Sequence, residues 1–394
     1  MDLSKYKTKH LFLLVGSNPL PNYVAAKLFA DTDSQIYFIH TNETEPVAQN
    51  LARNLDLSDH RVCYIQVDDA ESNDIFSKVA EAAKDKESIG LHYTGGTKAM
   101  SVHAYRAIQA VSLQAVFSYL NARNLTMLID QERTRSKEYP VGLAVSLKIE
   151  ELLKLHDYDK LKKSITHIPE LSTLCHQLLQ TPQQDWGSWC YQNLREQKQS
   201  GKTDFKNKTK LKAVELPTTA PFTPLQANWG DCITLGEWAE KLFWQVDKFA
   251  EFLAGLWLEH YVLSAIQRVT MVCDITDTGL GIEPVGHNQF EFDVVAMRGY
   301  QLFALSCTTS ADRGLIKSKL FEAHIRARQM GGDEAHVAMV CYAPEHDPDK
   351  NPMSIQREAE KQWEGAKNKV RVFGEQHLPN LADHLRQWFT HSTG

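Results

Sequence analysis

The sequence predicts a mixed α/β protein with a Rossmann-like N-terminal domain, a helical connector and a second α/β domain at the C-terminus. The chain has 394 residues, more than one hydrophobic core usually serves. Apolar strand patterns alternate with helical patterns over the N-terminal third; the alternation stops near residue 143 and returns in another order near residue 251. We therefore expect domains at 1–142, 143–250 and 251–394.

In the N-terminal domain, short continuous apolar runs predict strands that are buried on both faces, as in a parallel sheet covered by helices. The strands are expected at 10–15, 35–40, 61–67, 88–94, 114–120 and 125–130. The helices between them are expected at 21–30, 45–55, 75–84 and 99–110. The last two strands flank the short segment Asn-Ala-Arg-Asn, so we expect them to form a hairpin.

The middle of the chain has helical periodicity, at 143–156, 165–180 and 235–255. Between the last two of these tracts, residues 195–212 contain seven Lys or Arg against two acidic residues. We interpret this basic segment first as a solvated connecting loop. The alternative is a strip that contacts the phosphate backbone of a nucleic acid.

The C-terminal domain is expected to contain two helices and three strands. The helices are expected at 255–269 and 317–330, the second ending at the glycine pair 331–332. The strands are expected at 290–299, 301–309 and 336–343, with a turn at 299–300 between the first two. This order predicts a second α/β domain.

Composition excludes several classes of protein. The chain has 43 Lys and Arg against 49 Asp and Glu, so any contact with nucleic acid must come from a local patch. Its seven cysteines are scattered and include no Cys-x-x-Cys pair, which disfavours a disulfide framework or a structural zinc site. We find no signal peptide pattern and no apolar run of about 18 residues. We expect a soluble cytoplasmic protein with no membrane contact.

The first candidate site lies in the loops that follow the N-terminal strands, because open parallel sheets bind ligands at the carboxyl ends of their strands. The candidate ligand-binding residues are Gly16, Ser17, Asn18 and Pro19 after the first strand, Thr41 and Asn42 after the second, and Thr94, Gly95, Gly96, Thr97 and Lys98 after the fourth. The last of these loops opens a helix, whose free amides favour anions, and its glycines permit close approach of a ligand. Its hydroxyls and its lysine suit phosphates and ribose. Neither a G-x-G-x-x-G fingerprint nor a Walker A loop is present, and a plain strand-to-helix turn would give the same bare pattern.

The strand followed by Thr-Gly-Gly-Thr-Lys-Ala-Met and a helix, together with the Gly-Ser-Asn loop, resembles the CARF domain (CRISPR-associated Rossmann fold). The downstream elements look like the restriction-endonuclease-like domain of CARF–PD-(D/E)xK nucleases. This resemblance implies a homodimer whose paired crevices bind a cyclic oligoadenylate, usually cyclic tetra-adenylate, made by type III CRISPR complexes. Ligand roles carried over by position fall on Ser17, Asn18 and the segment 94–98.

The second candidate site is in the C-terminal domain. Hydrolysis of a phosphodiester with bound Mg²⁺ or Mn²⁺ needs carboxylate ligands and a lysine that activates water or steadies charge. Asp293 lies late in the run Phe-Glu-Phe-Asp, with Glu291 two residues earlier on the same face and Glu259 on the preceding helix. In the family pattern Asp293 binds the metal, and Glu291 is its candidate companion.

The strand after Asp293 departs from the family pattern. Ser306 stands where the family has Glu, and Thr308 stands where it has Lys. We favour the hypothesis that the missing groups have moved to Lys319 and Glu322, which are three residues apart on the next helix and share a face. The candidate catalytic residues are Asp293, Lys319, Glu322, Ser306 and Glu259.

We therefore expect a metal-dependent endonuclease, gated by cyclic oligoadenylate, that hydrolyses RNA or DNA. Two alternatives remain. In one, the nuclease-like domain is inactive and the protein is a sensor; in the other, the CARF crevice itself cleaves the messenger. The sequence chooses neither the scissile polymer nor the ring size.

Overall fold

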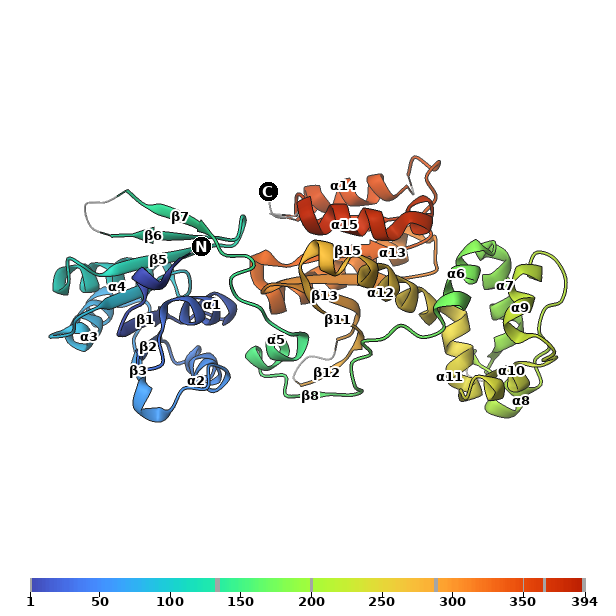
Figure 1. The fold of residues 1–394 in the computed structure, drawn as a ribbon, viewed down its shortest axis with the longest axis horizontal. Coiled ribbons are helices and arrows are strands. Elements are labelled where there is room, and N and C mark those ends of the chain that lie inside the picture. The colour runs from blue at the N-terminus through green and yellow to red at the C-terminus, as the bar shows by residue number, and fades with distance from the viewer. Residues whose placement is uncertain are drawn as a thin grey trace.

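A computed structural model describes residues 2–131, 135–198, 201–286, 290–349, 351–363 and 366–391. The molecule is elongated, with three bodies in a row (Figure 1). The N-terminal α/β domain lies at one end, the C-terminal α/β domain lies in the centre, and a group of helices from the middle of the chain lies at the other end. Among the described residues, no helix is both long enough and apolar enough to span a membrane.

The N-terminal domain is built on a seven-stranded sheet. Its strands, in spatial order, are β3 (Val62–Gln66), β2 (Gln35–His40), β1 (His10–Leu14), β4 (Ile89–His92), β5 (Val116–Asn121), β6 (Thr126–Asp130) and β7 (Lys137–Pro140). The first five are parallel, and β6 and β7 continue the sheet antiparallel. The α/β fold and the hairpin of β5 and β6 confirm the prediction. β7 has no counterpart among the predicted strands, because its side chains are largely exposed and carry no apolar signal.

Helices cover both faces of this sheet. They are α1 (Leu20–Phe29) and α2 (Glu45–Asn54) on one face, and α3 (Ser72–Ala83) and α4 (Lys98–Val111) on the other. Alternate residues of each strand divide between the two cores: on β1, Leu11 and Leu13 pack with α1 and α2, whereas Phe12 and Leu14 pack with α3 and α4. Both faces are therefore apolar, which explains the continuous apolar runs in the sequence.

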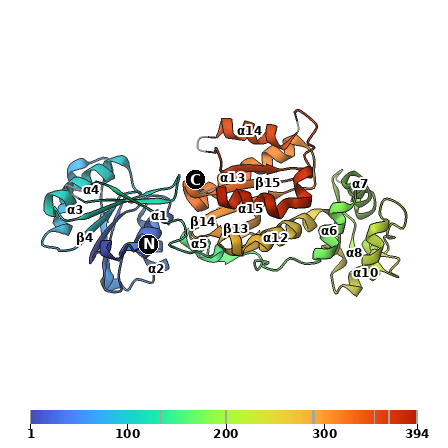
Figure 2. The ribbon, with the colours of Figure 1, turned by 45° about the horizontal axis from the view of Figure 1, so that its top comes forward.

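The C-terminal domain has a five-stranded mixed sheet. Its strands, in spatial order, are β11 (Ile275–Ile282), β13 (Phe292–Arg298), β14 (Gln301–Cys307), β15 (His336–Val340) and β16 (Val370–Phe373). Its helices are α12 (Trp257–Val269) and α15 (Leu381–His391) on one face, and α13 (Arg313–Gly331) and α14 (Pro352–Gln362) on the other (Figure 2). The predicted hairpin of β13 and β14, the strand β15 and the helices α12 and α13 are present. The elements β11, β16, α14 and α15 extend the predicted set.

A short segment after the first domain packs on both α/β domains. The side-chain amide of Asn50 on α2 donates to the backbone oxygens of Lys154 and Leu155 at the end of α5 (Ile149–Leu155), at 2.8 Å each. Further on, β8 (Lys160–Leu161) pairs with β12 (Pro284–Val285) of the C-terminal domain. The predicted helix at 165–180 is wrong in its first part, because Thr166 pairs with Leu280 of β11 instead.

The remaining middle segment forms the helical body. Its helices are α6 (Ser172–Gln180), α7 (Gln183–Leu194), α8 (Lys208–Lys212), α9 (Gln226–Trp229), α10 (Leu235–Lys241) and α11 (Val246–Glu251). A π-helical turn, Phe252–Leu256, joins α11 to α12. Trp186, Trp229 and Trp238 are buried in the core of this body. The domain boundaries at 142/143 and 250/251 stay predictions.

In its described part, the basic segment 195–212 forms a small hairpin, β9 (Arg195–Gln197) and β10 (Thr203–Phe205), followed by α8. Lys198 and Lys210 both form ion pairs with Glu196. Exposed ion pairs of this kind contribute little to stability. The segment is therefore a folded surface element rather than a plain loop.

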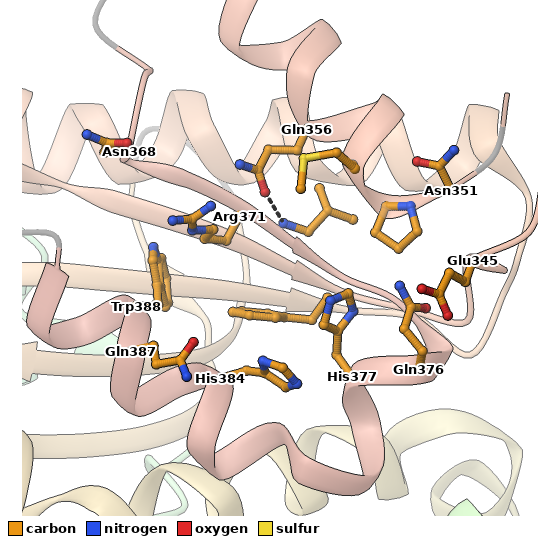
Figure 3. A pocket seen from close by; sticks show the side chains of 14 residues that line it. Glu345, Asn351, Gln356, Asn368, Arg371, Gln376, His377, His384, Gln387 and Trp388 are labelled. Carbon is orange, nitrogen blue, oxygen red and sulfur yellow. Dashed lines mark hydrogen bonds between the residues drawn. The ribbon is translucent and has the colours of Figure 1, made fainter. Parts of the chain in front are cut away.

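The outer edge of β16 is covered by hydrogen bonds from within the chain. The amide of Val370 donates to Ala366 O at 3.2 Å, that of Val372 to Gln356 Oε1 at 3.3 Å, and that of Gly374 to His377 Nδ1 at 3.0 Å. Figure 3 shows the bond that Gln356 accepts from Val372, beside a cavity of about 860 Å³ between α14 and α15. The donors that an edge strand normally exposes are thus engaged.

Candidate functional site

The two glycine-containing loops of the N-terminal sheet lie against each other. A Cβ on Gly95 would lie 2.1 Å from Leu14 O, and a Cβ on Gly16 would lie 3.0 Å from Gly96 N. Gly96 also has a positive φ of 72°, which favours glycine. The sequence needs glycine here because backbone meets backbone at the carboxyl ends of β1 and β4.

The second loop presents hydrogen-bond donors at the start of α4. Thr97 caps this helix, and its hydroxyl oxygen accepts from Met100 N at 3.2 Å. Lys98 is the first helical residue and is exposed. Thr94 is tied into the sheet, because its hydroxyl accepts from Leu120 N at 2.7 Å. The helix start and Lys98 therefore favour an anion at this crevice.

Asn18 lies between the crevice and the C-terminal domain. Its Oδ1 accepts from Leu20 N at 3.0 Å, next to Pro19 at the start of α1. Its Nδ2 lies against Gly332, at the end of α13, so closely that a Cβ on that glycine would be 2.3 Å away. Ser17 is exposed. The first loop thus touches the other domain directly.

Among the described residues, the cavity next to Thr41 and Asn42 has no lining residue from these two loops. Thr41 and Asn42 line this cavity, which has a volume of about 600 Å³ and lies at the ends of β2 and β3. Its ionisable lining residues are Glu43, Asp68, Asp69, Glu71, Asp74 and Lys78. Five carboxylates against one ammonium group disfavour phosphate binding there.

In the C-terminal domain, Asp293 lies at the start of β13, opposite the end of β14. Its Oδ2 accepts from the Ser306 hydroxyl at 3.0 Å and from the Cys307 amide at 2.6 Å. Lys319 on α13 places its Nζ 3.7 Å from the same oxygen and donates to Cys307 O at 3.0 Å. Asp293 is 13% exposed and Lys319 39%, so solvent reaches the lysine more than the carboxylate. The structure therefore brings Asp293, Ser306 and Lys319 together.

Two further carboxylates lie close to Asp293. Burial raises the pKa of Glu259 well above its usual value, and the charges of Asp293 and Glu291 act in the same direction. Loss of hydration also raises the pKa of Glu291, while Lys163 opposes the shift. Keeping all three carboxylates ionised in this partly buried position costs free energy, and a nearby cation would reduce that cost.

Lys163 is a neighbour that sequence reasoning missed. Its Nζ lies 2.9 Å from Glu283 and 3.6 Å from Glu291. It belongs to the connecting segment that reaches this site through the pairing of β8 with β12. No local motif signals such a long-range placement.

Glu322 and Thr308 are placed differently. Glu322 is exposed, and no hydrogen bond or ion pair in the described ranges joins it to Asp293. Thr308 uses its hydroxyl to accept from Ser310 N at 3.2 Å, which stabilises the turn after β14. The structure therefore gives Lys319, but not Glu322, a contact with Asp293.

Asp293, Glu259 and Glu291 form a group that we call the acidic site. Their carboxylate oxygens match what a hard divalent cation prefers. Within the part of the chain that the structure describes, however, no three His, Cys, Asp or Glu side chains are arranged to hold a metal ion. Asp293 instead is engaged by Ser306, the Cys307 amide and Lys319. The residue types fit a cation, and binding would require these side chains to rearrange.

Comparison with known proteins agrees with both halves of this description. The family model "Card1 CARF domain" matches residues 11–158, and "Card1-like, endonuclease domain" matches residues 247–392. A search of curated proteins finds no match.

Three solved structures share the fold. Can2 from Sulfobacillus thermosulfidooxidans, solved with cyclic tetra-adenylate, is 16% identical with a TM-score of 0.70, covering 96% of this chain and 99% of Can2. Protein VC1899 from Vibrio cholerae is 16% identical with a TM-score of 0.68, covering 98% of this chain and 99% of VC1899. A type III CRISPR defence DNA nuclease activated by cyclic oligoadenylate is 18% identical with a TM-score of 0.52, covering 88% of this chain and 48% of that nuclease. The chain therefore contains a Card1-type CARF domain followed by a Card1-like endonuclease domain.

Proposed function

We propose that this protein is a nuclease of type III CRISPR defence that cyclic oligoadenylate, in particular cyclic tetra-adenylate, activates. Its substrate is RNA, DNA or both. The two matched domains support a pairing of ligand sensing with endonuclease activity. The fold shared with Can2, which was solved with cyclic tetra-adenylate, supports this choice of activator.

The contact between Asn18 and Gly332 is the observation that carries the proposal. Asn18 belongs to the crevice loop, and Gly332 caps the C-terminal end of α13. The same helix carries Lys319, which contacts Asp293. A ligand that shifts the loop would therefore shift α13 and with it Lys319, which contacts Asp293. This contact is a physical connection by which ligand binding could change the activity of the other domain.

We propose that Mg²⁺ or Mn²⁺ serves the reaction, held by Asp293 with Glu291 and Glu259. When bound, such an ion neutralises charge on the scissile phosphate and lowers the pKa of attacking water. Lys319 supplies a positive charge to the phosphate in place of the lysine that Thr308 replaces. Ser306 donates to Asp293 and holds its carboxylate in orientation.

A sensor without nuclease activity is the second candidate. The absence of a carboxylate at Ser306 and of a cation at Thr308 favours it, because neither side chain replaces the charge of the family residue. One assay separates the two functions. Purified protein is incubated with labelled RNA and DNA, with Mg²⁺ or Mn²⁺, and with or without cyclic tetra-adenylate. We expect cleavage that depends on both metal and activator; no cleavage with any metal or ring size would establish the sensor.

Lys98→Ala should weaken binding of cyclic tetra-adenylate at least about tenfold, near 1.4 kcal/mol. Lys98 is exposed at the start of α4, where a charge-assisted bond to a phosphate is strong. Calorimetry measures the affinity, and Lys78→Ala, in the acidic cavity of β2 and β3, is the matched control. Unchanged affinity in both Lys98→Ala and Thr97→Ala would contradict the crevice assignment.

We also propose a homodimer that binds one ring. A ring of repeated adenylates has rotational symmetry, which two identical crevices related by a two-fold axis can match. Light scattering should give twice the mass of the 44.7 kDa chain, and calorimetry should give one ring per two chains. A monomer that binds one ring per chain would exclude this arrangement.

A further inference from the structure

A further cavity lies between α7 and the ends of the C-terminal strands, near the acidic site. It has a volume of about 800 Å³. One wall is the turn Thr309–Ala311, which begins three residues after Ser306, together with Tyr342, Pro344 and Glu375. The other wall is α7. We call this cavity the α7 groove.

The helix α7 has two distinct faces. Trp186, Cys190 and Leu194 recur every four residues and are buried. Trp186 Nε1 and Cys190 Sγ both donate to Leu253 O, at 2.9 and 3.6 Å, in the π-helical turn before α12. The opposite face lines the groove with Gln183, Gln184, Gly187, Ser188, Tyr191 and Gln192. The helix is thus anchored to the segment that leads into Glu259, and its polar face is turned to the groove.

The groove is lined by uncharged hydrogen-bonding groups. Its polar lining consists of amides and hydroxyls, and Glu375 is its single ionisable acid or base apart from tyrosine. Most of the electrostatic attraction for a phosphate backbone comes from Lys and Arg, and this lining contains neither, so it offers a phosphate hydrogen bonds but no counter-charge. Amides and hydroxyls instead suit the polar edges of bases and sugars.

Tyr191 adds an exposed aromatic ring to this lining. It is 60% exposed, although an aromatic side chain normally gains by burial. Within the described part of the chain, Tyr191 makes no ring contact, hydrogen bond or cation–π contact. The cations of this region lie outside the lining: Lys319 contacts Asp293 at the acidic site, and the basic segment 195–212 follows α7 directly in the sequence.

We propose that the α7 groove holds unpaired bases of the substrate strand next to the scissile phosphate, and that Tyr191 stacks on one of them. Lys319 and the lysines of 195–212 would then contact the phosphate backbone of the strand on the two sides of these bases. Contacts to bases and contacts to phosphates would thus be made by different parts of the protein. This inference rests on the proposed nuclease function. It assigns to the helical body a role in substrate binding that neither matched domain covers.

The first test compares Tyr191→Ala with Tyr191→Phe. Fluorescence anisotropy measures the affinity for labelled single-stranded RNA and DNA oligonucleotides, with cyclic tetra-adenylate and Mg²⁺, in an Asp293→Asn background that prevents cleavage. Loss of the ring should weaken binding about tenfold, as loss of one base–aromatic stack does, whereas Tyr191→Phe should bind within about twofold of the parent. Phe243→Ala is the control, since Phe243 is 97% exposed on the same helical body and does not line the groove.

The second test removes the base instead of the ring. Oligonucleotides with one abasic position, moved stepwise across the cleavage site, are bound to the Tyr191 parent and to Tyr191→Ala. At one position, the abasic site should lower the affinity of the parent about tenfold and that of Tyr191→Ala little. The reason is that the abasic site and the substitution each remove the same base–tyrosine contact. Equal losses in both proteins at every position, or wild-type affinity in Tyr191→Ala, would overturn the groove assignment.

The two proposals fail in different ways. If the wild type cleaves on activation but Tyr191→Ala binds and cleaves normally, the groove assignment alone is wrong. If the wild type neither binds nor cleaves nucleic acid with the activator, the nuclease function is wrong and the groove assignment falls with it.

Discussion

Asp293→Asn should reduce activator-dependent cleavage at least about a hundredfold, to background. The change keeps the shape of the side chain and removes its charge. Asp293 receives hydrogen bonds from Ser306 and from the Cys307 amide and lies near Lys319, so its carboxylate is the most firmly held of the acidic site. Initial rates on labelled RNA and DNA with saturating activator measure the effect.

Two controls make this result specific. Asp383→Asn, on α15, removes an exposed carboxylate that pairs with Arg386 and should leave the rate unchanged. Calorimetry should show that Asp293→Asn binds cyclic tetra-adenylate as the wild type does, because the crevice lies in the other domain. Cleavage by Asp293→Asn within about threefold of wild type would remove Asp293 from the reaction.

Lys319→Ala should also cost about a hundredfold or more, as loss of one preorganised transition-state contact often does. Lys319 is the cation that the structure places at Asp293, at 3.7 Å. Lys317→Ala is the matched control, since Lys317 is on the same helix but pairs with Glu358. The same cleavage assay applies. Normal cleavage by Lys319→Ala would show that the missing lysine has not moved to this helix.

Restoring the family residues provides a gain-of-function test of the same idea. Ser306→Glu with Thr308→Lys, introduced into Lys319→Ala, should recover part of the lost rate, because Ser306 contacts Asp293 and Thr308 follows two residues later. Glu322→Ala tests whether α13 supplies both of the missing groups, Lys319 and Glu322, or Lys319 alone. Since Glu322 is exposed and away from the bonds of Asp293, we expect its removal to change the rate little.

Local periodicity was enough to predict the strands β1 to β6 of the N-terminal sheet, because most of their residues are apolar and form short runs, but it missed β7, whose side chains are largely exposed. No element was predicted after residue 343, so β16 (Val370–Phe373) and α15 were missed, although α15, which packs on α12, has an amphipathic sequence. The residues of the acidic site divide in the same way. Asp293 and Glu259 follow from a strand and a helix pattern, whereas Lys163 arrives through strand pairing between distant segments.

Contacts between domains were the least accessible to sequence reasoning. Asn18 was predicted as a ligand-binding residue, and nothing in its loop signals that its amide meets Gly332 more than 300 residues later. Thr41 and Asn42 follow a strand end as predicted, but the acidic side chains around them come mainly from the next loop of the sheet. The strands and the loops at their ends could be anticipated, and the electrostatic surroundings of each loop could not.

The hydrogen bonds along the edge of β16 have a consequence for the behaviour of many copies in a crowded cell. An open edge strand can recruit an identical strand from another chain and so begin an aggregate. Here Gln356 accepts a hydrogen bond from the amide of Val372 in β16, and His377 accepts one from the amide of Gly374 directly after it. At the other edge, Thr166 and Leu280 exchange backbone bonds at 3.3 and 3.0 Å. The central sheet is therefore resistant to growth by strand addition at both of its edges.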